Sequence, residues 1–441
     1  STGTKRVINM KITVIGIGYV GLVTATCLAE MGNQVCCVEK EAGKLEKLKA
    51  GIPPIYEPGL PDLLTSNLAN QRLTFSTSIG HGVKHSHLIF ICVGTPERDN
   101  GRLDLSQVEE VARKIAADLT EYRLLVIKST VPIITQKQIT TVIRRHKKKG
   151  VPFEVASNPE FLREGSAVYD FMNPDRIVIG VTSTRARKLL GELYAGFNCP
   201  KVVTTPIAAE LIKHASNSFL ALKISYINVV ADICEKVGVD IKEVASGMGY
   251  DHRIGRDFLE TGIGYGGSCL SKDVKTFASV AQGLGIDFKL LRETEAVNQD
   301  RAIRFVDKVK KAAGALSGKT IAVWGLSFKP DTDDIREAPS LKIIPELRKE
   351  GAKIKAYDPA ATASFRRAFP ENESITYQSD MYQTLAGADA LLVLTEWDQF
   401  KNADIKHMKS LMKTQVIIDG RNIYPPDTMR GEGFKYYGVG R

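Results

Sequence analysis

Residues 10–21 read Met-Lys-Ile-Thr-Val-Ile-Gly-Ile-Gly-Tyr-Val-Gly, and this stretch decides the fold. The apolar run from Lys11 to Ile15 predicts a buried strand, and the pattern after it predicts a helix. Between this strand and this helix, Gly16, Gly18 and Gly21 form the pattern G-x-G-x-x-G. This pattern permits a tight turn and lets a pyrophosphate approach the helix N-terminus closely. The stretch therefore predicts a dinucleotide-binding βα unit, the alternative being a glycine turn that only packs.

A carboxylate follows at the spacing that this kind of unit uses. Glu39 stands at the end of the next predicted strand, Gln34 to Val38. An acid at this position accepts hydrogen bonds from ribose hydroxyls and repels a 2′-phosphate. This favours NAD over NADP as the cofactor, although the neighbouring Lys40 leaves a strict preference open.

Apolar β-branched runs alternate with helical patterns in two parts of the chain, which predicts an α/β fold with two doubly wound, Rossmann-like parallel sheets. The predicted strands are Lys11 to Ile15, Gln34 to Val38, Leu88 to Val93, Leu124 to Ser129 and Phe153 to Ser157, then Thr320 to Trp324, Lys353 to Tyr357, Ala390 to Leu394 and Gln415 to Asp419.

A long helix is predicted between these two parts. It begins at Thr205-Pro206, a capping residue followed by proline, and ends at Gly238. One apolar stripe, Ile207 to Ile233, suits a contact between domains or in a dimer. We expect three domains: residues 10–205, which bind NAD; residues 206–315, a helical middle domain; and residues 316–441, a second Rossmann-like domain.

Composition narrows the class of protein. The chain has 441 residues, 43% of them hydrophobic, which suffices for several cores. No apolar run approaches the roughly 18 residues of a membrane span, and no apolar segment precedes Met10, so we expect a cytoplasmic protein with a native start at Met10 and a loose tail before it. The net charge of +10 is spread along the chain apart from Arg144 to Lys149, which disfavours nucleic acid as a partner. The seven cysteines lack metal-ligand spacing, so no metal is expected.

The second series of strands opens without the glycine triplet. Gly325 is followed by a long polar turn, residues 325–337, that offers Lys329 and Arg336 to a phosphate or a base. This pattern predicts a second nucleotide site that does not take a dinucleotide. Two salt-bridged surface cations are the alternative.

Most cysteines lie in apolar runs and are predicted to be buried, namely Cys27, Cys36, Cys37, Cys92 and Cys234. One cysteine departs from this pattern. Cys269 lies in Gly-Ile-Gly-Tyr-Gly-Gly-Ser-Cys-Leu-Ser-Lys-Asp (262–273), where a helical pattern begins. A thiol at a helix N-terminus beside Lys272 ionises more easily, because positive charge favours the thiolate. Asp273, four residues on, shares a helix face with the sulfur. The setting predicts a reactive nucleophile.

Two further pairs are unusually polar for their positions. Glu160 and Glu164 follow a predicted strand, at the sheet edge where doubly wound proteins bind ligands. Lys213 and Asn217 are one turn apart on the long helix, away from its apolar stripe, where they suit an oxyanion. The alternative is that each pair is part of the ordinary polar surface of the protein.

Seven motifs together resemble the UDP-glucose 6-dehydrogenases of the UDP-glucose/GDP-mannose dehydrogenase family. The similarity runs from Met10 to about Asp358 and weakens beyond. The motifs are residues 16–21, 129–132 (Ser-Thr-Val-Pro), 158–165 (Asn-Pro-Glu-Phe-Leu-Arg-Glu-Gly), Lys213 with Asn217, 251–255 (Asp-His-Arg-Ile-Gly), 266–273 and 328–332 (Phe-Lys-Pro-Asp-Thr).

The resemblance implies a four-electron oxidation of UDP-glucose to UDP-glucuronate with two NAD. Asp273, with a water held near Thr130, would take the hydroxyl proton. Cys269 would form a thiohemiacetal and then a thioester, and Glu160 would activate the hydrolytic water. Lys213 and Asn217 would stabilise the oxyanion.

The resemblance also implies the binding residues and the assembly. Those implied for NAD are Gly16, Gly18, Tyr19, Val20, Gly21, Glu39, Thr95, Thr130, Glu164 and Lys272. Those implied for UDP-glucose are Glu160, Phe161, Leu162, Lys213, Asn217, Arg253, Tyr265, Gly266, Phe328, Lys329 and Arg336. Arg253 would reach a neighbouring subunit, which implies a homodimer or a higher homo-oligomer.

Two loop residues depart from the family pattern. Ser271 replaces a proline often found between the nucleophile and the lysine, and Ile134 stands where glycine is usual. The same chemistry on GDP-mannose or an N-acetylated UDP-sugar, a single-step dehydrogenase and an inactive nucleotide-binding protein remain alternatives. Asn-Pro-Asp-Arg (173–176) and the Ser-Cys-x-x-Lys-Asp form favour UDP-glucose.

Overall fold

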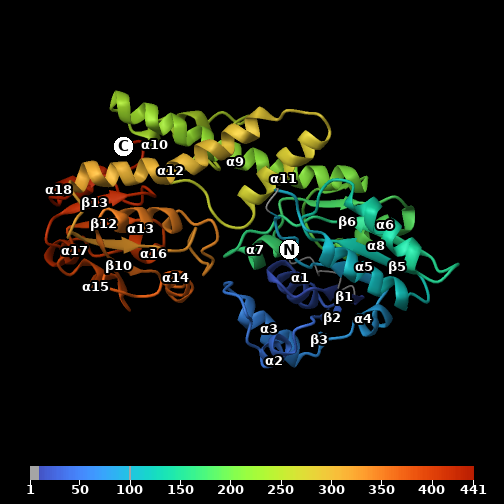
Figure 1. The fold of residues 1–441 in the computed structure, drawn as a ribbon. Helices are drawn as coiled ribbons and strands as arrows, with labels where there is room; N and C mark the ends of the chain where they lie inside the picture. Colours follow the sequence, from blue (N-terminus) through green and yellow to red (C-terminus); the bar gives the residue numbers. More distant parts are fainter. Residues whose placement is uncertain (1–8, 99–100) are drawn as a thin grey trace, which may run out of the picture. The chain divides into compact units, whose positions relative to one another are not determined.

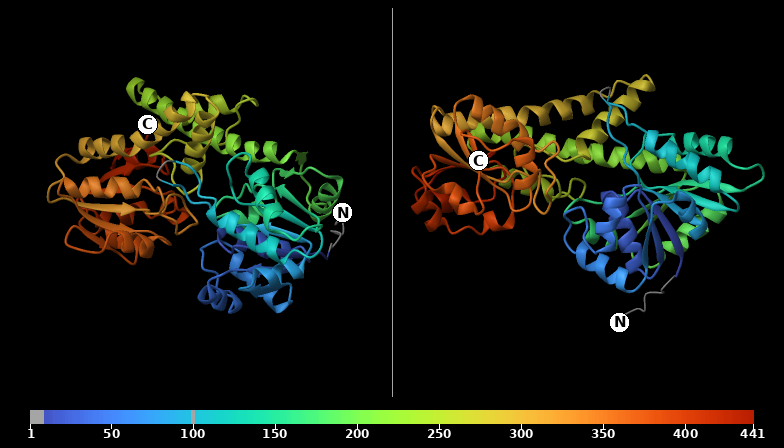
Figure 2. Two further views of the ribbon diagram at one scale, coloured as in Figure 1. Left: turned by 45° about the vertical axis from the view of Figure 1, so that its right-hand side comes forward. Right: turned by 60° about the horizontal axis from the view of Figure 1, so that its bottom comes forward.

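The computed structural model describes residues 9–98 and 101–441 and divides into two compact units, Ser1–Ser216 and Asn217–Arg441. Each unit is built on one sheet with helices on both faces (Figures 1 and 2). The α/β class with two Rossmann-like sheets is therefore confirmed. The predicted tail lies outside the described residues except for Asn9, and the division into three domains remains a prediction.

The sheet of the first unit has, in the described part of the chain, eight strands in the order β3-β2-β1-β4-β5-β6-β7-β8. Only the β6–β7 pair is antiparallel among the pairings of the described strands, so β7 and β8 run against the other six. The strands are β1 (Lys11–Ile15), β2 (Gln34–Val38), β3 (Leu73–Ser76), β4 (Leu88–Ile91), β5 (Arg123–Ile127), β6 (Phe153–Ser157), β7 (Ile177–Gly180) and β8 (Lys201–Thr204).

Two apolar layers cover the faces of this sheet, because successive strand residues point to opposite sides. One layer packs under α1 (Tyr19–Glu30), α2 (Ala42–Lys49), α3 (Leu60–Ala69), α7 (Ala167–Met172) and α8 (Thr184–Leu193). The other packs under α4 (Ile79–His85), α5 (Ser106–Asp118) and α6 (Thr135–His146). The carboxyl ends of β1, β4, β5 and β6 consequently share one edge, from which the glycine turn projects.

The sheet of the second unit is parallel throughout its described strands, in the order β11-β10-β9-β12-β13-β14. Its strands are β9 (Thr320–Trp324), β10 (Lys353–Tyr357), β11 (Ile375–Tyr377), β12 (Ala390–Val393), β13 (Val416–Asp419) and β14 (Lys435–Tyr437). Its helices are α10 (Ile241–Gly249), α11 (Leu270–Gly283), α12 (Lys289–Ala313), α13 (Ser340–Lys349), α14 (Thr362–Ala368), α15 (Met381–Leu385), α16 (Asp398–Lys401), α17 (Ile405–Leu411) and α18 (Pro426–Gly431).

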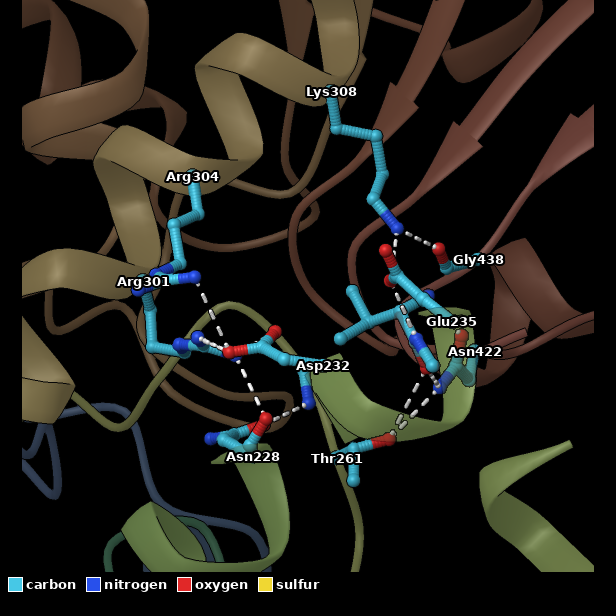
Figure 3. A network of polar contacts seen from close by, with 12 residues as sticks. Asn228, Asp232, Glu235, Thr261, Arg301, Arg304, Lys308, Asn422 and Gly438 are labelled. Atoms are coloured by element: carbon cyan, nitrogen blue, oxygen red, sulfur yellow. Dashed lines mark hydrogen bonds and ion pairs between the residues drawn. The ribbon is translucent and has the colours of Figure 1, made fainter. Parts of the chain in front are cut away.

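Helix α9 (Pro206–Val237) matches the predicted long helix. Thr205 accepts the N–H of Ala208 at its start, and Gly238 has φ +75° just past its end. In the second unit α9 is joined to α12 by ion pairs of Asp232 with Arg301 and of Glu235 with Lys308 (Figure 3). The same face of α9 holds the loop that leads to Cys269, because Asn228 Oδ1 accepts the N–H of Gly262 at 2.9 Å.

Among the described residues, none of the helices combines the length and the apolar character needed to cross a membrane.

Candidate active site

The glycine turn leaves space at the start of α1. Gly16 has φ +89°, which favours glycine, and a Cβ on Gly21 would lie 1.9 Å from the carbonyl oxygen of Gly16. A Cβ on Gly18, by contrast, would meet nothing within 4 Å. The first turn of α1 contains no acidic residue, so its N–H groups meet no competing carboxylate there. Turn and helix therefore fit the pyrophosphate of NAD.

Glu39 lies beside this turn and is held in its ionised form. Its carboxylate accepts the N–H of Ile17 at 3.3 Å and pairs with Lys44 at 3.0 Å. Burial alone would raise its pKa, but the hydrogen bond and charge of Lys44, with the N–H groups of Glu41 and Ile17, lower the pKa below the usual range. Lys40 is exposed. The sequence analysis did not identify Lys44.

Thr95 and Thr130 lie together at the carboxyl edge of β4 and β5. The Thr95 hydroxyl donates to the carbonyl of Thr130 at 2.8 Å. A cavity of about 10 Å³ lies beside Thr130, Glu210 and Lys213. A cavity of this size holds about one water molecule. This cavity in the first unit therefore has room for the water that is expected near Thr130.

Glu160 and Lys213 form a buried ion pair in the first unit. Lys213 Nζ lies 3.2 Å from Glu160 Oε1 and donates to the Glu160 carbonyl at 2.7 Å. The other carboxylate oxygen accepts the N–H of Leu162 at 2.6 Å. The side chains of Arg176 and Lys213 lie over the Phe161 ring, at 3.6 and 5.2 Å from its centre. The loop after β6 therefore carries a carboxylate with a fixed cation beside it.

Three further charged side chains of the first unit were missed by the sequence analysis because their partners are distant in sequence. Buried Lys128 donates to the Asn158 side chain at 3.2 Å, and burial lowers its pKa to about 8. Glu210 accepts the N–H groups of Ile134 and Gln136 at 2.7 and 2.9 Å, which caps α6. Glu57 is the third.

Cys269 stands at the N-cap position of α11 and is exposed. The Ser268 hydroxyl lies 3.7 Å from its sulfur. The five cysteines predicted to be buried are buried, and burial raises the pKa of both Cys27 and Cys92 to about 12. An exposed sulfur at a helix start differs from these thiols in both access and electrostatics.

Asp273 lies one turn into α11, and its backbone N–H donates to the Cys269 carbonyl at 2.9 Å. Its Oδ2 accepts the side-chain N–H of Asn217 at 2.6 Å. Both side chains are buried. Its Oδ1 has no hydrogen-bond partner among the described residues, so this buried carboxylate retains an acceptor for a further group.

The glycine loop before Cys269 packs against the polar turn after β9. A Cβ on Gly266 would lie 2.5 Å from the carbonyl of Glu337, and the N–H of Gly267 donates to the Arg336 carbonyl at 2.8 Å. Arg421 ties the two loops together by donating to the carbonyls of Gly264 and Phe328. Its position directly after β13, at the carboxyl edge of the sheet, is the signal that would have identified it.

Two predicted cations of the second unit, Arg253 and Arg336, are paired within their own turns. Arg336 makes a bidentate contact with Asp334, and Arg253 makes one with Asp251. Their side chains are 62% and 78% exposed, so a ligand can reach both. The remaining predicted binding residues are half-buried, apart from buried Tyr265: Tyr19, Val20, Leu162, Glu164, Lys272, Phe328 and Lys329.

The structure thus gathers the predicted residues in two sets, each within its own unit. The first unit holds Glu39, Thr95, Thr130, Glu160, Glu164, Lys213 and the glycine turn, and the second holds Asn217, Arg253, Tyr265, Gly266, Cys269, Lys272, Asp273, Phe328, Lys329 and Arg336.

Three sequence profiles of one family match successive parts of the chain. They are described as the NAD binding domain, residues 10–198, the central domain, residues 207–300, and the UDP binding domain, residues 322–426, of the UDP-glucose/GDP-mannose dehydrogenase family. The chain belongs to this family. The expected membership is confirmed, and the order of the matched parts agrees with the order of the two sheets.

Curated relatives cover nearly the whole chain. The UDP-glucose 6-dehydrogenase TuaD of Bacillus subtilis (strain 168) is 45% identical over 431 residues, which are 98% of this chain and 93% of the relative. The UDP-glucose 6-dehydrogenase of Pseudomonas aeruginosa is 44% identical over 442 residues, 98% of each. A UDP-glucose dehydrogenase structure from Pyrobaculum islandicum has a TM-score of 0.91 at 36% identity and covers 100% of both chains.

Proposed function

We propose that this family member is an NAD-dependent UDP-glucose 6-dehydrogenase, which oxidises the C6 hydroxyl of UDP-glucose to the carboxylate of UDP-glucuronate. The observation that carries the proposal is the full-length similarity to relatives named for this activity, at up to 45% identity, with both an NAD-binding and a UDP-binding domain matched. The open glycine turn and the ionised Glu39 support NAD as the cofactor.

Each residue's role is carried over from the family motif that it matches. NAD, when bound, accepts a hydride in each of the two oxidations. Asp273, with a water held near Thr130, takes the proton of the C6 hydroxyl. Cys269 adds to the aldehyde carbon to give a thiohemiacetal, whose oxidation leaves a thioester. The covalent bond retains the aldehyde between the two oxidations.

The thioester is then hydrolysed. Glu160 removes a proton from the attacking water, and the thiolate of Cys269 leaves as the carboxylate forms. Lys213 and Asn217 stabilise the oxyanion of the tetrahedral intermediate with a charge and an N–H. The buried pairing of Glu160 with Lys213 supports this division of labour, because it holds a carboxylate and a cation next to each other in fixed positions.

The substrate's nucleotide is assigned to the second unit. Tyr265, Gly266, Phe328, Lys329 and Arg336 line the two loops that Arg421 joins, and the cations there suit a diphosphate. Phe161 and Leu162 of the first unit bind the substrate in this scheme, as does Arg253 from a partner subunit, and Val20, Glu164 and Lys272 contact NAD.

A homodimer is the assembly that we propose. Apolar residues of α9 in the second unit, Phe219, Tyr226, Val229, Ile233 and Val237, are exposed on one stripe. Such a stripe on a single chain marks a protein interface. Light scattering coupled to gel filtration should give twice the chain mass, and Tyr226→Asp should lower it; a monomeric wild type would refute the dimer.

The stoichiometry of NADH tests the activity. We expect two NADH per molecule of limiting UDP-glucose. Cys269→Ala should abolish this turnover, whereas Cys199→Ala, a half-buried thiol outside the assigned site, should retain it. One NADH per sugar, or full activity without the Cys269 thiol, would refute the covalent route. NADH formed from GDP-mannose or an N-acetylated UDP-sugar but not from UDP-glucose would reassign the substrate.

A further inference from the structure

Glu57 is a buried carboxylate that the scheme above does not use. It lies in the loop before α3 and is 3% exposed. Its Oε2 accepts the hydroxyl of Tyr19 and, at 2.7 Å, the N–H of Gly165, and its Oε1 accepts the N–H of Val168 at 3.3 Å. A carboxylate withdrawn from water requires such donors in place of its hydration. Glu57 therefore joins three segments of the first unit.

Two of these segments carry residues assigned to NAD. Tyr19 is the first residue of α1, inside the glycine turn, and Gly165 directly follows Glu164. The N–H of Gly165 also donates to the Tyr19 hydroxyl at 3.0 Å, so Tyr19, Glu57 and Gly165 are all bonded to one another. The glycine turn and the loop after β6 are thus fixed to each other through one side chain.

We infer that Glu57 is a positioning residue for the cofactor, which holds the glycine turn and the 158–165 loop in the arrangement that NAD binds. The inference rests on the proposed NAD-dependent function. A site that is already ordered spends less of its interaction free energy on immobilising loops during binding. Removing the carboxylate should therefore weaken NAD binding, although Glu57 makes no contact with NAD in this account.

The first unit offers a matched control in the pair of Tyr122 and Glu154. The Tyr122 hydroxyl donates to Glu154 Oε1 at 3.0 Å, so the chemistry is that of Tyr19 and Glu57. Tyr122 precedes β5 and Glu154 lies near the start of β6, at the amino edge of the sheet, whereas the glycine turn follows the carboxyl end of β1. Changes there perturb the same unit away from the cofactor edge.

Isothermal titration calorimetry with NAD on the full chain tests the inference. Glu57→Ala should raise the Kd for NAD about tenfold and Tyr19→Phe about threefold. The increase in Kd for the double variant should be smaller than the product of the two single increases, because both changes break the same set of hydrogen bonds. Glu57→Gln, which keeps one acceptor oxygen, should restore part of the affinity. Glu154→Ala and Tyr122→Phe should leave the Kd within about twofold of wild type while lowering stability.

The outcomes separate the two proposals. If the wild type binds NAD tightly and the Glu57 and Tyr19 variants bind it equally well, the positioning role is overturned but the proposed function is not. The same holds if the Glu154 and Tyr122 controls weaken NAD binding as much as the Glu57 and Tyr19 variants do. A wild-type chain that binds no NAD overturns the proposed function and this inference with it. If Glu57→Ala does not fold, Tyr19→Phe and Glu57→Gln carry the same comparison, since each leaves most of the contacts in place.

Discussion

The turns after β1 and β9 begin alike and end differently. Each opens with a glycine in the left-handed region, Gly16 at φ +89° and Gly325 at φ +96°. After β1 the helix starts at Tyr19, so its N-terminus stands open beside the turn. After β9 the helix starts only at Ser340, and a polar loop fills the interval. The same order of strand, turn and helix thus leaves backbone N–H groups open to a ligand after β1. After β9 a long polar loop stands between the strand and the helix.

The acids at the ends of the second strands show the same difference. Glu39 accepts one N–H from the turn, that of Ile17, and pairs with Lys44. Asp358 is 2% exposed, and its oxygens accept N–H groups of the turn residues Leu326 and Ser327 and of the residues that follow it. An acid that already holds its own turn has no capacity left for a ribose. This is a physical reason for the prediction that the second unit takes no dinucleotide.

Gly21→Ala should produce the largest change in the first turn. The new Cβ would lie 1.9 Å from the carbonyl oxygen of Gly16, a backbone atom that moves only if the turn opens. We expect NAD affinity to fall on the order of 100-fold, because the turn and the helix N-terminus move together. Calorimetric titration with NAD measures it.

Gly325→Ala is the counterpart in the second turn. Its Cβ would lie 2.5 Å from the backbone nitrogen of Thr395 at a φ that strains any other residue. It should destabilise the second unit and leave NAD affinity unchanged. A loss of NAD affinity equal to that of Gly21→Ala would show that the two turns are not functionally distinct.

Asp358→Ala should destabilise the second unit by about 3 kcal/mol, because it leaves several buried N–H groups without an acceptor. Both tryptophans of the chain, Trp324 and Trp397, lie in this unit, so their fluorescence during urea unfolding reports on it. Asp358→Asn, which keeps one acceptor oxygen, should lose less. An unfolding midpoint that does not move in the alanine variant would contradict the structural role of this acid.

Glu39→Gln should change the choice of cofactor and not the stability of the turn. The amide retains an acceptor for the ribose but loses the charge that repels a 2′-phosphate, so the ratio of the Kd values for NADP and NAD should fall by about tenfold. Because the pKa of Glu39 is lowered, the preference for NAD over NADP should persist to acidic pH. It should be lost as the pH falls through the pKa of Glu39, where the carboxylate becomes neutral. A ratio that the amide leaves unchanged would assign the preference to another residue.

The sequence predicts much of this comparison because its signals are local. The observed bounds of β1, β2, β6, β9 and β10 coincide with the predicted ones, since each is a short segment of apolar or alternating residues that a turn follows. Strands β3, β7, β8, β11 and β14, of three or four residues each, were not predicted. The reversal of β7 and β8 depends on pairing, which no local pattern encodes.

The candidate site divides in the same way. The glycines, Cys269 and Asp273 were found because spacing along the chain carries their chemistry. Glu57 lies 108 residues from Gly165, and Arg421 lies 157 residues from Gly264, so only the folded chain shows what each of them holds. Long-range hydrogen bonds of buried charges are therefore the part of a site that a single sequence conceals.

Ile134 gives the smallest predicted effect and sharpens the comparison of turns. It precedes α6 with φ +80°, the region that Gly16 and Gly325 occupy, but it carries a β-branched side chain that is exposed. Ile134→Gly should stabilise the first unit by about 1 kcal/mol, because relief of left-handed strain exceeds the entropy that glycine adds to the unfolded chain. Ile133→Gly, next to it and without a positive φ, should destabilise the unit instead. Circular dichroism during urea unfolding measures both changes. A loss of stability on Ile134→Gly would mean that the hydrogen bond from the N–H of residue 134 to Glu210 depends on the stiff isoleucine side chain more than on the shape of the turn.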